Sequence, residues 1–148
     1  MSLVDILIRY RRWRPVKEIM ALWCIEIPPQ VKIGKDFQLA HRGFSTVIHP
    51  ATIIGDRVKI FHQVTIGRAD SYLPGDKSTM KDIVISDDVI IYPGAKVLGG
   101  PGTTTIGRGT IIAANAVLTR STGEYEIWGG VPARKISNRT DIGPHASN

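Results

Sequence analysis

Two histidines stand at equivalent places in the hydrophobic pattern of this chain. His41 follows Leu39 by two residues, and His62 follows Ile60 by two residues. An imidazole has an unperturbed pKa of about 6.5, so near neutral pH it can take a proton from a weak nucleophile such as an alcohol. The same side chains could instead be structural, or could be two of the three histidines of a zinc site. The elements that hold them decide between these uses.

A step of six residues runs through most of the chain. Thirteen positions keep this step within four groups, and each is Ile, Leu or Val. They are Ile27, Ile33 and Leu39; Ile48, Ile54, Ile60 and Ile66; Ile85, Ile91 and Val97; and Ile106, Ile112 and Leu118. Six is not a multiple of 3.6, so the pattern disfavours an α-helix. It predicts a parallel β-helix in which three hexads form a coil of about 18 residues.

Two further positions of each hexad fit this interpretation. The residue four places after the aliphatic one is mostly small or β-branched and is predicted to point inward. These residues are Val31, Thr52, Val58, Val64, Val89, Ala95, Thr110 and Ala116, with Phe37 as a bulky exception. The residue directly after the aliphatic one is often glycine, which predicts a turn at a corner of the coil. These glycines are Gly34, Gly55, Gly67 and Gly107.

Breaks in the repeat predict where the chain departs from regular coils. The step from Leu39 to Ile48 is nine residues, an insertion of three. The step from Ile66 to Ile85 is nineteen, and residues 68–82 within it are polar and aperiodic. We expect this segment to be an arm that leaves the β-helix. Long loops on rigid scaffolds often carry function.

The hexad repeat places His41 and His62 at one corner of the predicted β-helix. The 21 residues from His41 to His62 equal one coil of about 18 plus the three inserted residues. The two side chains are therefore expected one coil apart, at a spacing of about 4.8 Å between strands. A zinc enzyme would need a third histidine at the same phase, and the sequence supplies none. His49, followed by Pro50, is interpreted as structural.

Three segments are predicted: a helical cap over residues 1–24, the β-helix over 25–136 and a flexible tail over 137–148. Pro15 is placed to open a second short helix that ends near Trp23. A cap over the open apolar end of the first coil is the favoured interpretation, because solenoids require one. The alternative is a basic, aromatic face that rests on an anionic membrane.

Composition indicates one domain and a cytoplasmic setting. Cys24 is the single cysteine, so no disulfide framework is expected. No apolar run reaches the ~18 residues of a membrane span, and no signal peptide is recognised. The net charge of +6 suggests an anionic partner or merely a solvated basic surface. Nucleic acid is not expected as a partner, since no binding motif is present.

Several motifs resemble those of a known family. The His-Arg-Gly of residues 41–43, the Val-Thr-Ile-Gly of 64–67 and the Gly-Val-Pro-Ala-Arg of 130–134 are similar to the hexapeptide-repeat acyltransferases. The similarity covers about residues 24–136 and is strongest to the serine acetyltransferase type and its polysaccharide O-acetyltransferase relatives. It implies an all-β, left-handed parallel β-helix that assembles as a homotrimer. It also implies acetyl-CoA as co-substrate, no metal, and active sites in grooves between subunits.

The resemblance also assigns residues. His41 would be the general base, Glu26 would replace the family's orienting aspartate, and His62 would contact the acceptor where the family often has glutamine. Implied contacts to the CoA pantetheine arm are Gly67, Pro93 and Ala114, and those to the nucleotide phosphates are Arg134 and Lys135. A carboxylate on the second imidazole nitrogen would fix the tautomer of the base.

Departures from the family bear on the acceptor. The family's arm reads Gly-Asp-Arg-His, whereas this arm has Lys77 and Ser78 at the last two places. Lysine cannot bind a carboxylate as arginine's fork does. About 25 residues precede the β-helix where the family has a large helical domain, and the C-terminus lacks the family's isoleucine. These differences predict a sugar hydroxyl as acceptor, held by His62, Lys77 and Ser78. The alternatives are a serine O-acetyltransferase without the helical domain and a non-catalytic scaffold.

Overall fold

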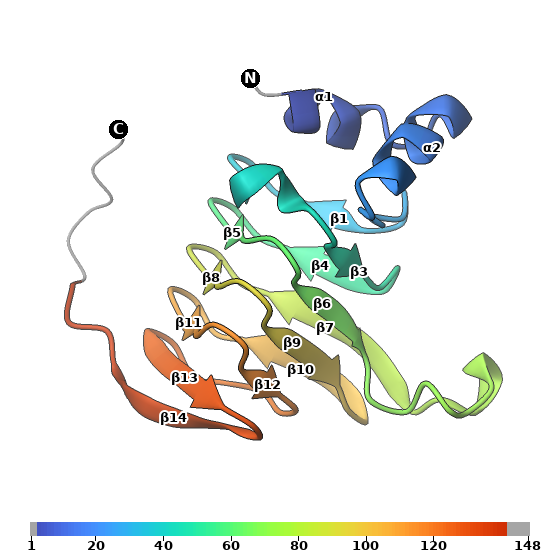
Figure 1. Ribbon diagram of the computed structural model, residues 1–148. Coiled ribbons are helices and arrows are strands. Elements are labelled where there is room, and N and C mark those ends of the chain that lie inside the picture. Colours follow the sequence, from blue (N-terminus) through green and yellow to red (C-terminus); the bar gives the residue numbers. More distant parts are fainter. Residues whose placement is uncertain (1–2, 142–148) are drawn as a thin grey trace.

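The computed structural model describes residues 3–141. Two short helices, α1 (Leu3–Arg9) and α2 (Arg14–Leu22), precede a series of short strands (Figure 1). The strands are β1 (Lys32–Ile33), β2 (Gln38–Leu39), β3 (Val47–Ile48), β4 (Thr52–Ile54), β5 (Lys59–Ile60), β6 (Thr65–Arg68), β7 (Met80–Ile85), β8 (Ile90–Ile91), β9 (Lys96–Gly99), β10 (Gly102–Ile106), β11 (Ile111–Ile112), β12 (Val117–Leu118), β13 (Glu126–Gly130) and β14 (Ala133–Asn138). Two 3₁₀ turns, η1 (Ala40–Gly43) and η2 (Gly75–Lys77), interrupt the strands.

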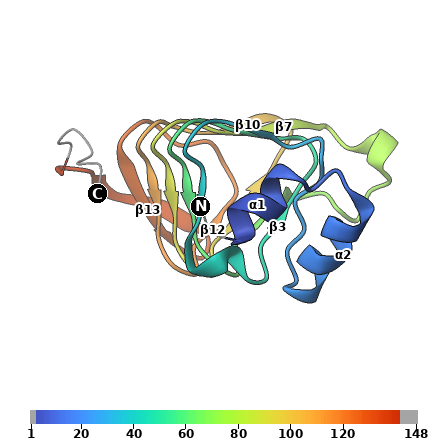
Figure 2. The same cartoon turned by 90° about the horizontal axis from the view of Figure 1, so that it is seen from above.

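Three sheets form the sides of the predicted left-handed parallel β-helix. Their strand orders are β1-β4-β7-β10, β2-β5-β8-β11-β13-β14 and β3-β6-β9-β12. Equivalent strands of successive coils pair in parallel, so that Leu39 lies beside Ile60 and Ile60 beside Ile91. Figure 2, seen from above, shows the coils lying over one another. Within the described chain, only β13 and β14 pair antiparallel. The fold class read from the hexads is confirmed.

The core follows the repeat. Of the thirteen aliphatic positions, all but Ile33 are buried, and Ile33 is partly buried against the core. The second inward row is buried as well, apart from the bulky Phe37. Burying one such aliphatic side chain contributes about 1.5–3 kcal/mol. The cap adds Val4, Leu7, Ile8, Val16 and Met20 to the same cluster. The helices therefore close the open end of the first coil.

Gly55 and Gly107 are needed for close approach of the coils rather than for a special backbone angle, whereas a Cβ at Gly67 would have room. A Cβ added at Gly55 would meet Asp87, and one at Gly107 would meet the backbone of Gly123 in the next coil. Neither glycine has a positive φ. Left-handed corner residues include Arg57 and Asp88, with φ of 55° and 61°. The turn explanation inferred from the sequence was therefore wrong at these positions, although the glycines themselves are required.

The C-terminal boundary also differs from expectation. β14 runs to Asn138, inside the segment predicted as a flexible tail. Arg139 is buried, donates a hydrogen bond of 2.9 Å to the carbonyl of Gly109 and pairs with Asp141. These long-range contacts hold the first residues of that segment on the β-helix. The rest of the predicted tail, residues 142–148, lies outside the described part.

The arm between β6 and β7 leaves the helix, as Figure 1 shows at the lower right. It is shorter than predicted, because Met80 already belongs to β7 and pairs with Gly102 of β10. None of the helices over residues 3–141 has the length and apolar character needed to cross a membrane.

The glycine contacts give a stability test. Gly107→Ala should lower the free energy of unfolding by about 1–3 kcal/mol, because the new methyl group overlaps the next coil. Gly100→Ala is the matched control: a Cβ there meets nothing within 4 Å, so its effect should stay within about 0.5 kcal/mol. Urea denaturation of both variants measures the difference. Equal stability of the two variants would contradict the close-approach explanation.

Candidate active site

The three-residue insertion after Leu39 forms a strained turn that presents His41. His41, Arg42 and Gly43 have φ of 51°, 61° and 62°, three left-handed residues in succession. A non-glycine residue held in this region costs about 1–3 kcal/mol and persists only where its surroundings enforce it. A neighbouring segment of the same chain supplies that support, since the Ser45 N–H donates to the carbonyl of Trp23 at 3.1 Å.

His41 and His62 are brought together at the corner after β2 and β5. Their ring centroids are 5.5 Å apart, and the rings meet edge to face at 88°. Both side chains line one pocket with Arg42 and Phe44. His41 is exposed, and the buried Nδ1 of His62 has no hydrogen-bond partner among residues 3–141. An unsatisfied imidazole nitrogen beside an exposed imidazole is an arrangement suited to a polar ligand.

A row of aromatic rings continues from this pair along the β-helix. The His41 ring is 5.6 Å from Phe61, and Phe61 stacks on Tyr92 at 5.1 Å with an interplanar angle of 9°. Sequence reasoning missed this row. The signal was present, because Phe61 and Tyr92 each follow a buried isoleucine of the hexad series and must therefore point outward.

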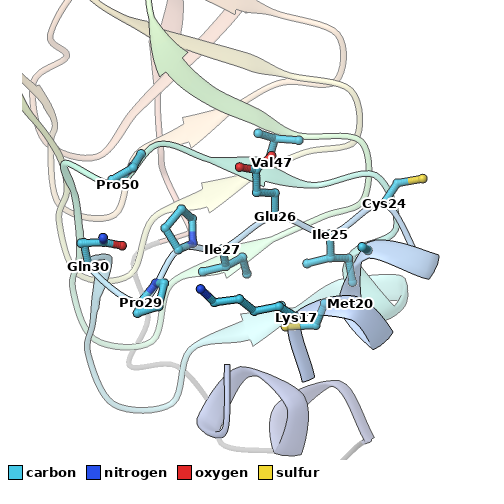
Figure 3. Close-up of a pocket in the computed structure, with 12 residues that line it drawn as sticks. Lys17, Met20, Cys24, Ile25, Glu26, Ile27, Pro29, Gln30, Val47 and Pro50 are labelled. Carbon is cyan, nitrogen blue, oxygen red and sulfur yellow. The ribbon is translucent and has the colours of Figure 1, made fainter. Parts of the chain in front are cut away.

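Glu26 lies beside the turn but is not joined to His41. Its backbone bridges to the next coil, with its N–H donating to Thr46 and its carbonyl accepting from Ile48. Its side chain lines a separate pocket with Lys17 and Cys24 (Figure 3). Within the described residues, no hydrogen bond or ion pair connects its carboxylate to His41. A single chain therefore does not assemble the Glu26–His41 pair expected from the resemblance.

The arm residues also lie apart from the histidines. Ser78 uses its hydroxyl within the arm, donating to Asp70 Oδ2 at 2.8 Å, and Arg68 donates to the carbonyl of Leu73 at 2.7 Å. Lys77 is exposed. The arm and the η1 turn project from different corners of the β-helix (Figure 2). One chain therefore does not bring Lys77 or Ser78 to the pocket of His62.

Two of the residues assigned to CoA share the histidine corner. The Gly94 N–H donates to the carbonyl of His62 at 3.2 Å, and the Asn115 N–H donates to that of Pro93 at 3.0 Å. Pro93 and Ala114 thus continue the corner below His62. Gly67 lies instead at the end of β6, where it pairs with Leu98.

The two cations assigned to phosphates differ in availability. Lys135 forms a 2.7 Å ion pair with Glu126 and lowers the pKa of that carboxyl, while burial opposes the shift. Hydrogen bonds from Trp128 Nε1 and the Gly123 N–H also favour the charged form of Glu126. Arg134 is exposed, and within residues 3–141 its guanidinium donates only to the adjacent Ala133 carbonyl. Arg134 is therefore the better placed of the two to meet an anion.

His49 has the structural role expected of it. Its Nδ1 accepts a hydrogen bond from the Ala51 N–H at 3.1 Å. Burial lowers the pKa of His49, the charge of Arg68 lowers it further, and Asp70 opposes them. Over the part of the chain that the structure describes, no group of three or more His, Cys, Asp or Glu is arranged to hold a metal ion.

The chain is similar to serine acetyltransferases in sequence. No protein-family model matches it. It is 44% identical over 103 residues to a plasmid-encoded serine acetyltransferase of Synechococcus elongatus, covering 66% of this chain and 30% of that protein. It is 34% identical over 129 residues to the serine acetyltransferase of Staphylococcus aureus, covering 86% of this chain and 56% of the relative. The chain thus spans between about a third and a little over half of the length of these relatives.

Solved structures of serine acetyltransferases are also similar to this chain. The serine acetyltransferase of Vibrio cholerae superposes with a TM-score of 0.71 at 26% identity, over 93% of this chain and 52% of that one. That of Brucella abortus, in complex with Coenzyme A, gives a TM-score of 0.71 at 26% identity, over 92% and 52%. With its hexad repeat, its three-sided parallel helix and these similarities, the chain is a hexapeptide-repeat β-helix that is similar to the serine acetyltransferases over part of their length.

Proposed function

We propose that this protein is an acetyl-CoA-dependent O-acetyltransferase, that its acceptor is L-serine and that it works in the cytoplasm. The observation that carries the proposal is the His41–His62 pair, whose ring centroids are 5.5 Å apart, with His41 on the left-handed η1 turn and His62 one coil away. The similarity to serine acetyltransferases in sequence and in structure supports it.

In this proposal His41 is the general base. Its imidazole takes the proton of the serine hydroxyl while that oxygen attacks the acetyl carbonyl carbon. As the carbon–sulfur bond breaks, the same imidazole returns the proton to the departing thiolate. His41 is suited to this role because it is exposed and has no hydrogen bond that must first be broken within the described chain. Glu26 would orient it only after its carboxylate turns toward the η1 turn.

The CoA site proposed here follows the corner below His62. Pro93 and Ala114 present backbone groups along that corner, and the exposed guanidinium of Arg134 offers charge-assisted hydrogen bonds to a phosphate. Lys135 is a weaker candidate because Glu126 already holds its ammonium. Gly67 is proposed to contact the pantetheine arm of CoA from the neighbouring side of the β-helix.

L-serine is better supported as the acceptor than the sugar hydroxyl that the arm sequence predicts. The relatives reported above are named serine acetyltransferases, and none is named as a sugar acetyltransferase. The pocket supports the same choice, since Arg42 lines it beside both histidines and its fork suits an amino-acid carboxylate. The arm argument for a sugar is weak, because Ser78 is bonded to Asp70 rather than turned to a ligand.

A second chain would complete this site. The arm that carries Lys77 and Ser78 leaves a corner other than that of the η1 turn (Figure 2), so within one chain it does not meet an acceptor held by His62. In a homotrimer the arm of one subunit could reach the histidine corner of the next. This arrangement accounts for an arm that leaves the scaffold without covering any part of its own pocket.

The acceptor proposal is tested by kcat/KM for L-serine against a panel of mono- and oligosaccharides, with free thiol release as the readout. Serine should win by at least about a hundredfold, because a site that pairs a carboxylate with Arg42 leaves that cation unpaired when a neutral sugar binds. A sugar that outperforms serine would overturn the proposal.

Two variants refine this comparison. Arg42→Asn, which tolerates a positive φ, and His62→Ala, which removes the imidazole, should raise the KM for serine about tenfold or more. The KM for acetyl-CoA should stay nearly constant in both. Parallel changes in both KM values would mean that the variants disturb the fold rather than the acceptor pocket.

We expect the protein to assemble as a homotrimer. Its melting temperature should rise with protein concentration, because each folded subunit is stabilised by association. Sedimentation equilibrium should return the mass of three chains, and dilution to the monomer should abolish turnover. A monomer that still transfers acetyl groups would exclude the shared site.

A further inference from the structure

The N-terminal cap has two faces of different character. Its inner face, which includes Val4, Leu7, Val16 and Met20, is buried against the first coil. Its outer face carries large apolar side chains in the open: Trp13 is 71% exposed, Tyr10 56% and Leu22 82%. Figure 1 shows both helices at the end of the β-helix where the first coil lies. Covering the open end of the first coil explains why the inner face is apolar, but it does not explain the apolar side chains on the outer face.

Apolar side chains form a stripe along α1 and the residue that follows it. The exposed Leu3, the half-buried Ile6 and the exposed Tyr10 are spaced three and four residues apart, and the Tyr10 N–H donates to the carbonyl of Ile6 at 3.1 Å, so they lie on one side of this helical segment. Tyr10 and Trp13 then line a shallow apolar hollow with Ile6, Leu7 and Val16. An exposed apolar surface of this kind marks a place of contact with a partner or a membrane.

Positive charge surrounds the stripe. Arg9, Arg12 and Arg14 are exposed within six positions of sequence, around Tyr10 and Trp13. Arg11 is turned inward and donates to the carbonyl of Val31 at 2.7 Å. The outer face thus combines three exposed arginines with a tyrosine and a tryptophan. Tyrosine and tryptophan prefer the boundary between lipid headgroups and acyl chains, and arginine is attracted to anionic headgroups.

We propose that the outer face of the cap binds an anionic lipid surface. The helices would lie in the plane of the headgroups, with Leu3, Tyr10 and Trp13 inserted and the arginines at the phosphates. A protein partner of ordinary composition is less well matched, because it would have to offset three closely spaced positive charges. This inference is independent of the proposed catalytic function, since it uses no residue of the histidine corner.

The intact protein should co-sediment with vesicles containing about one-third phosphatidylglycerol and not with vesicles of phosphatidylcholine alone. Each basic residue at the surface strengthens binding about fivefold. Arg12→Gln with Arg14→Gln should therefore weaken binding about 25-fold, and Trp13→Ser should weaken it as well. Lys81→Gln with Arg120→Gln removes the same charge from exposed positions away from the cap, so this control should bind much like the wild type.

Three outcomes would overturn the proposal. The first is an absence of binding to the anionic vesicles. The second is an equal loss of binding in the control pair, which would attribute attraction to net charge alone. The third is a lower sedimentation mass in the cap variants without vesicles, which would make this face an interface between protein chains. Thermal unfolding by circular dichroism verifies that each variant is folded before it is scored.

Discussion

The in-register stacking of one coil on the next is the constraint on which the rest of the structure depends. Every sixth residue is an aliphatic side chain in a closed interior, and a slip of one residue would turn that row to solvent. Fixing the inward row also fixes the outward one. His41 therefore meets His62 one coil away, and Phe61 stacks on Tyr92 for the same reason. The scaffold converts a sequence period into rows of equivalent side chains.

The candidate site lies where the repeat is broken. The insertion after Leu39 adds a turn with three left-handed residues, which regular hexads would not contain. A rigid stack of coils on one side and the Trp23–Phe44 contact, with ring centroids 5.8 Å apart, on the other hold this turn in place. Precise positioning by rigid elements is what a catalytic side chain requires. The longer break supplies the arm, which the Arg68–Asp70–Ser78 contacts stiffen.

Local periodicity allowed much of this to be predicted from sequence. The hexads predict the sheets and the core, the 21-residue spacing predicts the shared corner of His41 and His62, and Pro15 predicts the start of α2. Features set by contacts between distant coils were not accessible. Arg139 is held by Gly109, 30 residues earlier, and Gly107 is needed because of Gly123. The sugar acceptor was inferred in part from two arm residues, Lys77 and Ser78, whose positions relative to the histidines no repeat determines.

The central claim is that His41 on its strained turn is the proton acceptor, and one substitution tests it most directly. His41→Asn removes the base while keeping a residue that tolerates a φ of 51°. We predict that kcat/KM for acetyl transfer to serine falls by about 10²–10⁴-fold. CoA affinity by calorimetry and the melting temperature should stay close to those of the wild type. A variant that binds CoA, folds normally and retains most of its activity would contradict the account.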